Sequence, residues 1–170
     1  MACNCTKCNS NKPCGCLDPA LTNPCSYTDC SVGSENAIGR ICIEHAFKNC
    51  LKAGLKLTGL NAEVAPSQWE FQVCEIGITA ADQLIMMRYI LNRTAEAHGL
   101  SINYHPKPIT DGDWNGSGCH TNFSTLPMRE DDGYSVILDA IKKLETKHEY
   151  HMSQYGSDNH LRMTGLYETA

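Results

Sequence analysis

Two short runs of alternating apolar residues, separated by a proline, stand in the stretch LNAEVAPSQWEFQV (residues 60–73). Side chains of a β-strand point alternately to opposite faces, so the apolar residues of 69–73 share one face and Glu70 lies on the other. Pro66-Ser67 marks a turn, because proline fixes φ and cannot donate to a central ladder. We therefore expect two strands within residues 55–74.

Helical patterns lie on both sides of these strands. Apolar residues recur at spacings of three and four, which is typical of amphipathic helices, in residues 35–53, 80–98 and 133–153. Ser34 is the expected N-cap of the first helix, and Thr79 with Asp82 forms a capping-box pattern at the second. Two shorter segments, 101–105 and 117–124, are expected to be extended. The chain thus alternates helices and strands from about residue 31.

Cysteine content separates the first 30 residues from the remainder. Seven of the 11 cysteines lie there: Cys3, Cys5, Cys8, Cys14, Cys16, Cys25 and Cys30. We expect a Cys-rich irregular tail at 1–30 and a single domain at 31–170. The tail's spacing could supply thiolates to a structural Zn²⁺ ion, and a flexible or disulfide-linked surface tail is the alternative.

Charge and hydropathy exclude two classes of partner. Fourteen basic and 19 acidic side chains give a net charge of −5, which disfavours nucleic-acid binding. No run of 18 apolar residues exists, and the N-terminus lacks the pattern of a secretory signal, so we expect no membrane span.

The remaining cysteines are scattered, as in reduced cytoplasmic enzymes, and Cys42 and Cys50 are expected in the core.

Two carboxylates in the opening stretch are candidate metal ligands. Glu63 and Glu70 are seven residues apart, and on one continuous strand they would face opposite ways. Across a turn at Pro66-Ser67 they could converge, and their repulsion would then require a proton or a hard cation such as Mg²⁺ or Mn²⁺. Exposed glutamates on an ordinary hairpin are the alternative.

A second candidate site is the segment NGSGCH (residues 115–120). Closely spaced glycines let a ligand or a strand approach the backbone. Alternation in the following extended segment places His120, Asn122 and Ser124 on one face, where they could serve a metal and a polar ligand. A tight hairpin with a hydrogen-bonded core histidine is the alternative.

These stretches resemble, in order, motifs of eukaryotic-type glutamine synthetases. The first is LNAEVAPSQWEFQV (60–73), the next are HPKPI (105–109) and GDWNGSGCHTNFST (112–125), and the last is RMTGLYET (162–169). The similarity covers about residues 31–170. It implies an ATP-dependent ligase that converts glutamate and ammonia to glutamine through γ-glutamyl phosphate.

The resemblance also implies roles for individual residues. Metal ligands would be Glu63, Glu70 and His120, holding Mg²⁺ or Mn²⁺. Glutamate would be bound by Asn115, Gly116 and Arg162, the nucleotide by Asn122, Ser124 and Arg129, and the mobile flap would contribute Glu168 as a catalytic residue beside Arg162.

The resemblance finally implies a fold and an assembly. We expect an α+β fold: a curved, mainly antiparallel sheet from segments 55–73, 101–105 and 117–124, with all three helices on one face. The family's upstream β-domain and its further metal and phosphate ligands have no counterpart in these 170 residues. The expectation is a partial catalytic domain that is inactive alone and active only with complementing subunits or within a longer chain. A non-catalytic module that binds glutamate, nucleotide or another subunit is the alternative.

Overall fold

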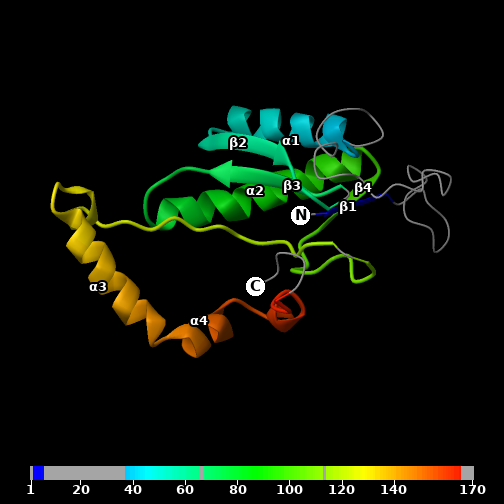
Figure 1. Cartoon of the computed structure of the whole chain (residues 1–170). Coiled ribbons are helices and arrows are strands. Elements are labelled where there is room, and N and C mark those ends of the chain that lie inside the picture. The colour runs from blue at the N-terminus through cyan, green and yellow to red at the C-terminus, as the bar shows by residue number, and fades with distance from the viewer. Residues whose placement is uncertain (1, 6–36, 66, 113, 166–170) are drawn as a thin grey trace.

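The computed structural model describes residues 2–5, 37–65, 67–112 and 114–165 (Figure 1). None of the described helices has the length and apolar character needed to cross a membrane. The elements are β1 (Ala2–Cys5), α1 (Arg40–Lys52), β2 (Leu57–Ala62), β3 (Trp69–Val73), α2 (Ile78–Ala97), β4 (Leu100–Asn103), the 3₁₀ turn η1 (Pro127–Arg129), α3 (Gly133–Glu145), α4 (His148–Gln154) and the 3₁₀ turn η2 (Asn159–Leu161).

The predicted hairpin around Pro66-Ser67 is confirmed. Strands β2 and β3 pair antiparallel, with Asn61 opposite Glu70 and Ala62 opposite Trp69, and an irregularity interrupts the register near Gly59. Backbone hydrogen bonds from Gln68 to Ala65 and from Glu63 to Gln68, both 2.9 Å long, close the turn. The register of this hairpin decides which side chains of β2 and β3 face the core, in agreement with the alternation in the sequence.

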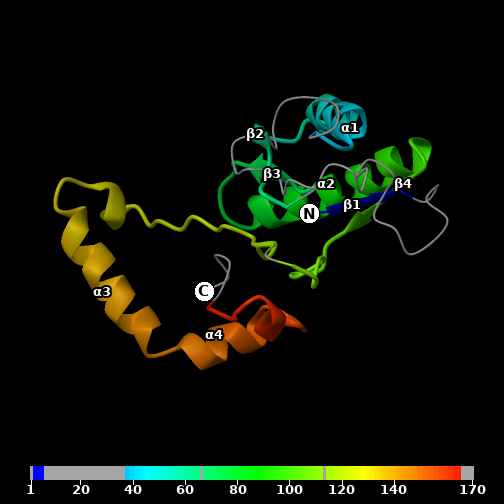
Figure 2. The ribbon, with the colours of Figure 1, turned by 45° about the vertical axis from the view of Figure 1, so that its right-hand side comes forward.

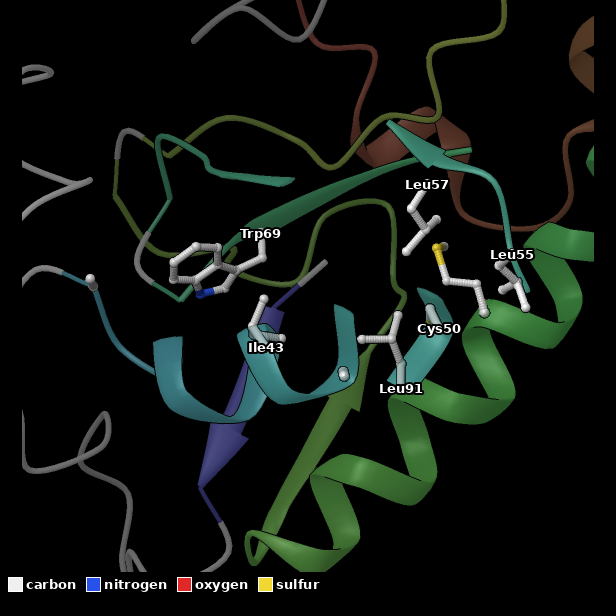
Figure 3. Packing of buried hydrophobic residues seen from close by; sticks show 9 residues of the cluster. Ile43, Cys50, Leu55, Leu57, Trp69 and Leu91 are labelled. Carbon is white, nitrogen blue, oxygen red and sulfur yellow. The ribbon is translucent and has the colours of Figure 1, made fainter. Parts of the chain in front are cut away.

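Helices α1 and α2 pack on each other and on the apolar face of this hairpin. The buried cluster joins both helices and both strands, as Figure 3 shows, and consists of Ala37, Ile43, Ala46, Cys50, Leu55, Leu57, Trp69, Met87 and Leu91. The Trp69 indole donates a hydrogen bond of 2.8 Å to the carbonyl of Ile38, so its one polar atom is satisfied. Each large apolar side chain buried here contributes about 1.5–3 kcal/mol.

Both core helices begin elsewhere than predicted. Gly39 has a φ of 82°, outside the helical region, so α1 begins at Arg40 and not at residue 35. Ser34 lies outside the described residues. The capping box at Thr79 and Asp82 is wrong, because α2 already begins at Ile78 after Gly77 and has no side-chain cap.

The predicted single sheet is also wrong. In the described part of the chain β2 pairs with β3, and β4 pairs with β1, giving two separate two-stranded sheets. Segment 117–124 is extended but joins no strand of either sheet. The described start of the Cys-rich tail is strand β1, with Cys3 opposite Ile102. The other predicted tail residues lie outside the description.

The third predicted helix is divided and lies apart from the core. Residues Thr146 and Lys147 interrupt it, separating α3 from α4. Figures 1 and 2 show both helices at a distance from α1 and α2, connected by a long extended segment. The apolar stripe of α3 is exposed, with 72% of Tyr134 and 54% of Ile141 accessible to solvent. The expectation that three helices cover one face therefore holds only for α1 and α2.

Candidate functional site

One face of the β2–β3 hairpin carries a row of polar side chains. Asn61 stands opposite Glu70, and Glu63, which follows directly after the end of β2, lies on the same face. The Asn61 amide donates a hydrogen bond of 2.6 Å to Glu63 Oε1. The Gln72 amide lies 3.3 Å from Glu70 Oε2. The hairpin thus brings together the two predicted carboxylates, each held by an amide.

This proximity has an electrostatic consequence. Partial burial raises the pKa of Glu63 above its ordinary value, and the nearby Glu70 carboxylate raises it further, while the bond from Asn61 acts in the opposite direction. Two converging carboxylates in a half-buried position fit a hard divalent cation, which would remove their repulsion. The predicted convergence is confirmed, and the ligand role remains a prediction.

His120 does not join the two glutamates in a metal-binding group. Across residues 37–65, 67–112 and 114–165, no three His, Cys, Asp or Glu side chains are grouped so that they could hold a metal ion. The His120 ring is exposed, and its Nε2 lies 3.3 Å from Asn122 Oδ1. These two residues do share a face, as their alternation predicted.

The predicted nucleotide ligands lie in, or directly after, the exposed segment that contains His120. Asn122 and Ser124 belong to the extended segment before η1, and Arg129 ends η1 itself. All three are exposed. Glu168, the predicted flap residue, lies outside the described residues.

The predicted glutamate ligands Gly116 and Arg162 are brought into contact. A Cβ atom placed on Gly116 would lie 2.9 Å from Arg162 Cδ, closer still to Cγ, and 3.2 Å from the carbonyl oxygen of Pro106. The amide of Ser117 donates to that same carbonyl over 2.7 Å. Glycine is therefore required here, because any side chain would displace Arg162.

Asn115, next to this contact, has an unsatisfied polar atom. Its Oδ1 is buried and has no hydrogen-bond partner among the described residues. A buried amide oxygen without a partner costs about 1–3 kcal/mol, and a bound ligand with an N–H group would recover that energy. Together, an acceptor at Asn115 and a cation at Arg162 complement the ammonium and carboxylate of an amino acid.

Three further residues shape this site without having been predicted as functional. His105 Nε2 lies 3.6 Å from Asp158 Oδ2, which ties the 105–117 loop to the segment that carries Arg162. The Lys107 ammonium donates to the carbonyl of Trp114. His105 belongs to a quoted motif, whereas nothing in the sequence around Asp158 signals this contact.

Comparison with known families is consistent with this geometry. A family model described as the glutamine synthetase catalytic domain matches residues 22–154. The chain therefore belongs to the glutamine synthetase catalytic-domain family.

Individual relatives agree with this assignment. The cytosolic glutamine synthetase isozyme of Medicago sativa is 51% identical over 142 residues, covering 83% of this chain and 40% of the relative. The glutamine synthetase of Saccharomyces cerevisiae is 53% identical over 143 residues, or 83% of this chain and 38% of the relative. The cytosolic isozyme of Daucus carota is 47% identical over 161 residues, or 94% and 46%. The chain thus spans less than half the length of these curated relatives.

Proposed function

We propose that this chain supplies the glutamate-binding and metal-binding part of a glutamine synthetase, the ligase that joins ammonia to glutamate with ATP. The observation that carries this proposal is the buried, unpaired Oδ1 of Asn115 beside the contact between Gly116 and Arg162. The names of the relatives support the reaction, and two of them support a cytoplasmic location.

Each group at the site has a definite task in the proposal. Asn115 Oδ1 accepts a hydrogen bond from the α-ammonium of glutamate, and the Arg162 guanidinium pairs with a carboxylate or phosphoryl oxygen. Glu63 and Glu70 hold Mg²⁺ or Mn²⁺ at the hairpin, and His120 acts as a metal ligand only once the site is completed by other parts of the enzyme. When bound, the ion offsets the negative charge of the phosphoryl and carboxylate oxygens. The open segment then provides Asn122, Ser124 and Arg129 to ATP.

We further propose that these 170 residues bind glutamate without turning it over. Phosphoryl transfer requires the metal and nucleotide ligands to be grouped around the reacting oxygens. In the part of the chain that the structure describes, His120 is not grouped with the glutamate pair. Complementing glutamine synthetase subunits would complete the site. A module that only binds glutamate, nucleotide or another subunit is the alternative function.

Calorimetric titration with L-glutamate tests the binding part. We expect saturable binding to the 170-residue chain, weakened at least about tenfold by Asn115→Ala or Arg162→Ala, because each substitution removes a charge-assisted hydrogen bond. Asn92→Ala and Arg93→Ala, at exposed positions of α2, are the matched controls. Equal affinity in all five proteins would refute the proposed glutamate site.

A chimera separates the ligase from the alternative. Residues 32–170 would replace the matching segment of the yeast glutamine synthetase, and glutamine formation from glutamate, ammonia and ATP would be measured. The proposal predicts activity that Glu63→Ala abolishes in the chimera. A correctly assembled chimera that binds glutamate but forms no glutamine would instead favour the non-catalytic module. The chain alone should form none.

A further inference from the structure

Two histidines from the core helices meet at the surface, outside the site described above. His45 on α1 and His98, directly after α2, place His45 Nδ1 3.1 Å from His98 Nε2. Their rings are 5.4 Å apart between centroids and nearly perpendicular, at 79°. His45 is exposed and His98 is half-buried, so solvent reaches the pair. We call these two residues the histidine pair.

The surrounding structure holds the histidine pair in place. One helical turn away on each helix, the Asn49 amide donates a hydrogen bond of 3.2 Å to the Thr94 hydroxyl. The His98 backbone amide is fixed by bonds to the carbonyls of Thr94 and Ala95, 3.2 and 3.0 Å long. The His45 ring therefore projects from α1 and the His98 ring from the residue directly after α2, and the core beneath packs these two helices together.

The spacing of the two nitrogens suits a transition metal. Metal–imidazole bonds of about 2.0–2.1 Å and the observed 3.1 Å separation give an angle at the metal of about 98°, between octahedral and tetrahedral values. We propose that the histidine pair binds a divalent transition-metal ion of the Zn²⁺, Ni²⁺ or Cu²⁺ class, with water at the remaining positions. Imidazole favours these ions over Mg²⁺.

Metal binding would replace the hydrogen bond between the two histidine rings and would require no further protein ligand. Without metal, one neutral ring donates its N–H to the other nitrogen. Metal binding needs lone pairs on His45 Nδ1 and His98 Nε2, so the donating ring moves its proton to its other nitrogen. The proposal is independent of the proposed ligase function, because Glu63 and Glu70 take no part in it.

This site would also strengthen the fold. The two ligands are 53 positions apart in sequence and meet only when α1 packs on α2. An ion that binds the folded chain and not the unfolded chain raises the unfolding temperature as its concentration increases. The second imidazole acts from a fixed position, so losing it should weaken binding at least about tenfold.

Thermal unfolding of the full chain, followed by circular dichroism under reducing conditions, tests the site. We expect NiCl₂ to raise the unfolding temperature of the unmodified chain and MgCl₂ not to match it. His45→Ala and His98→Ala should each remove the Ni²⁺-dependent increase, and the double variant should behave like either single one. His148→Ala and His160→Ala, which leave the histidine pair intact, should retain it. An increase that survives in the double variant would overturn the proposal.

A second measurement uses the unmodified chain, so it does not depend on the variants folding. Substoichiometric paramagnetic Ni²⁺ broadens the NMR signals of the nuclei nearest to it. The imidazole signals of His45 and His98 should broaden first. If the signals of other histidines, of Glu63 and Glu70 or of the Cys-rich tail broaden before them, the ion binds elsewhere and the proposal fails.

Discussion

Asn61 faces Glu70 across the β2–β3 hairpin, and its amide simultaneously donates to the carboxylate of Glu63. The Asn61 amide thus holds a carboxylate just beyond the end of β2 beside a carboxylate on the neighbouring strand β3. The arrangement is costly without a cation, because burial and the charge of Glu70 both oppose ionisation of Glu63. A divalent cation bound between the two acids would remove this cost.

The first prediction concerns pH and Glu63. Its folded pKa is raised above the ordinary value of 4.5, so the folded chain binds the proton more tightly than the unfolded chain. The contribution of Glu63 to the free energy of unfolding therefore falls as pH rises from 4.5 through the higher folded value. Glu63→Gln should remove this fall, stabilising the chain at pH 7 by less than about 1 kcal/mol, as measured by urea denaturation.

The control for this experiment is Glu130→Gln, an exposed position before α3. It should leave the pH dependence unchanged. Millimolar Mg²⁺ or Mn²⁺ should recover the lost stability of the unmodified chain at pH 7 and have less effect on Glu63→Gln. A pH profile that Glu63→Gln leaves intact would contradict the coupling of the two acids.

A second prediction compares two glycines of the same loop. Gly116→Ala places a methyl group against the side chain of Arg162, whereas a Cβ on Gly118 meets nothing within 4 Å. Gly116→Ala should therefore reduce glutamate affinity at least about tenfold by moving Arg162, and Gly118→Ala should leave it unchanged. Titration calorimetry measures both. Similar affinities for the two variants would show that the contact has no role in binding.

The third prediction tests the core between the two helices. Leu91 is 0% exposed, whereas Ile85 on the same helix is 65% exposed. Leu91→Ala should lower the free energy of unfolding by about 2–5 kcal/mol, since it removes buried contacts and leaves a cavity. Ile85→Ala should change it by less than about 0.5 kcal/mol. Urea denaturation followed by circular dichroism distinguishes these values, and equal losses would mean that α2 packs differently.

The fourth prediction concerns thiol reactivity. Burial raises the pKa of Cys42 and raises that of Cys50 to about 11, while Cys74 and Cys119 are exposed. Iodoacetamide at pH 8 should label Cys74 and Cys119 rapidly, and Cys42 and Cys50 only after unfolding, because the thiolate is the reacting form. Peptide mapping by mass spectrometry follows each site. Rapid labelling of Cys50 in the folded chain would be incompatible with this core.

Local patterns predicted the hairpin and the core faces of the two helices packed on it. The turn predicted at Pro66-Ser67 puts Glu63 and Glu70 on one face of the hairpin, which was one of the two alternatives that the sequence left open. The spacing of Cys42 and Cys50 correctly placed both in the core, where both are buried. These features depend on neighbours in sequence, which is why they could be recognised without coordinates.

Features that depend on distant partners were not predictable in the same way. Segment 117–124 has strand-like alternation, yet its backbone joins no strand of the described sheets. The residues of α3 form a clear amphipathic stripe, and a stripe states only that a helix has an apolar side, not what covers it. The contact of Gly116 with Arg162 joins segments far apart in sequence, and only the family resemblance had grouped them.

The pairing of β1 with β4 has a consequence for synthesis on the ribosome. Ala2 pairs with Asn103, so during synthesis β1 has no partner until β4, which lies far downstream in the chain, has emerged. Closing so long a loop costs conformational entropy. The elements between the two strands, which are α1, the hairpin and α2, can pack together before this loop closes. We therefore expect β1 to be the last of these elements to become protected from hydrogen exchange during refolding.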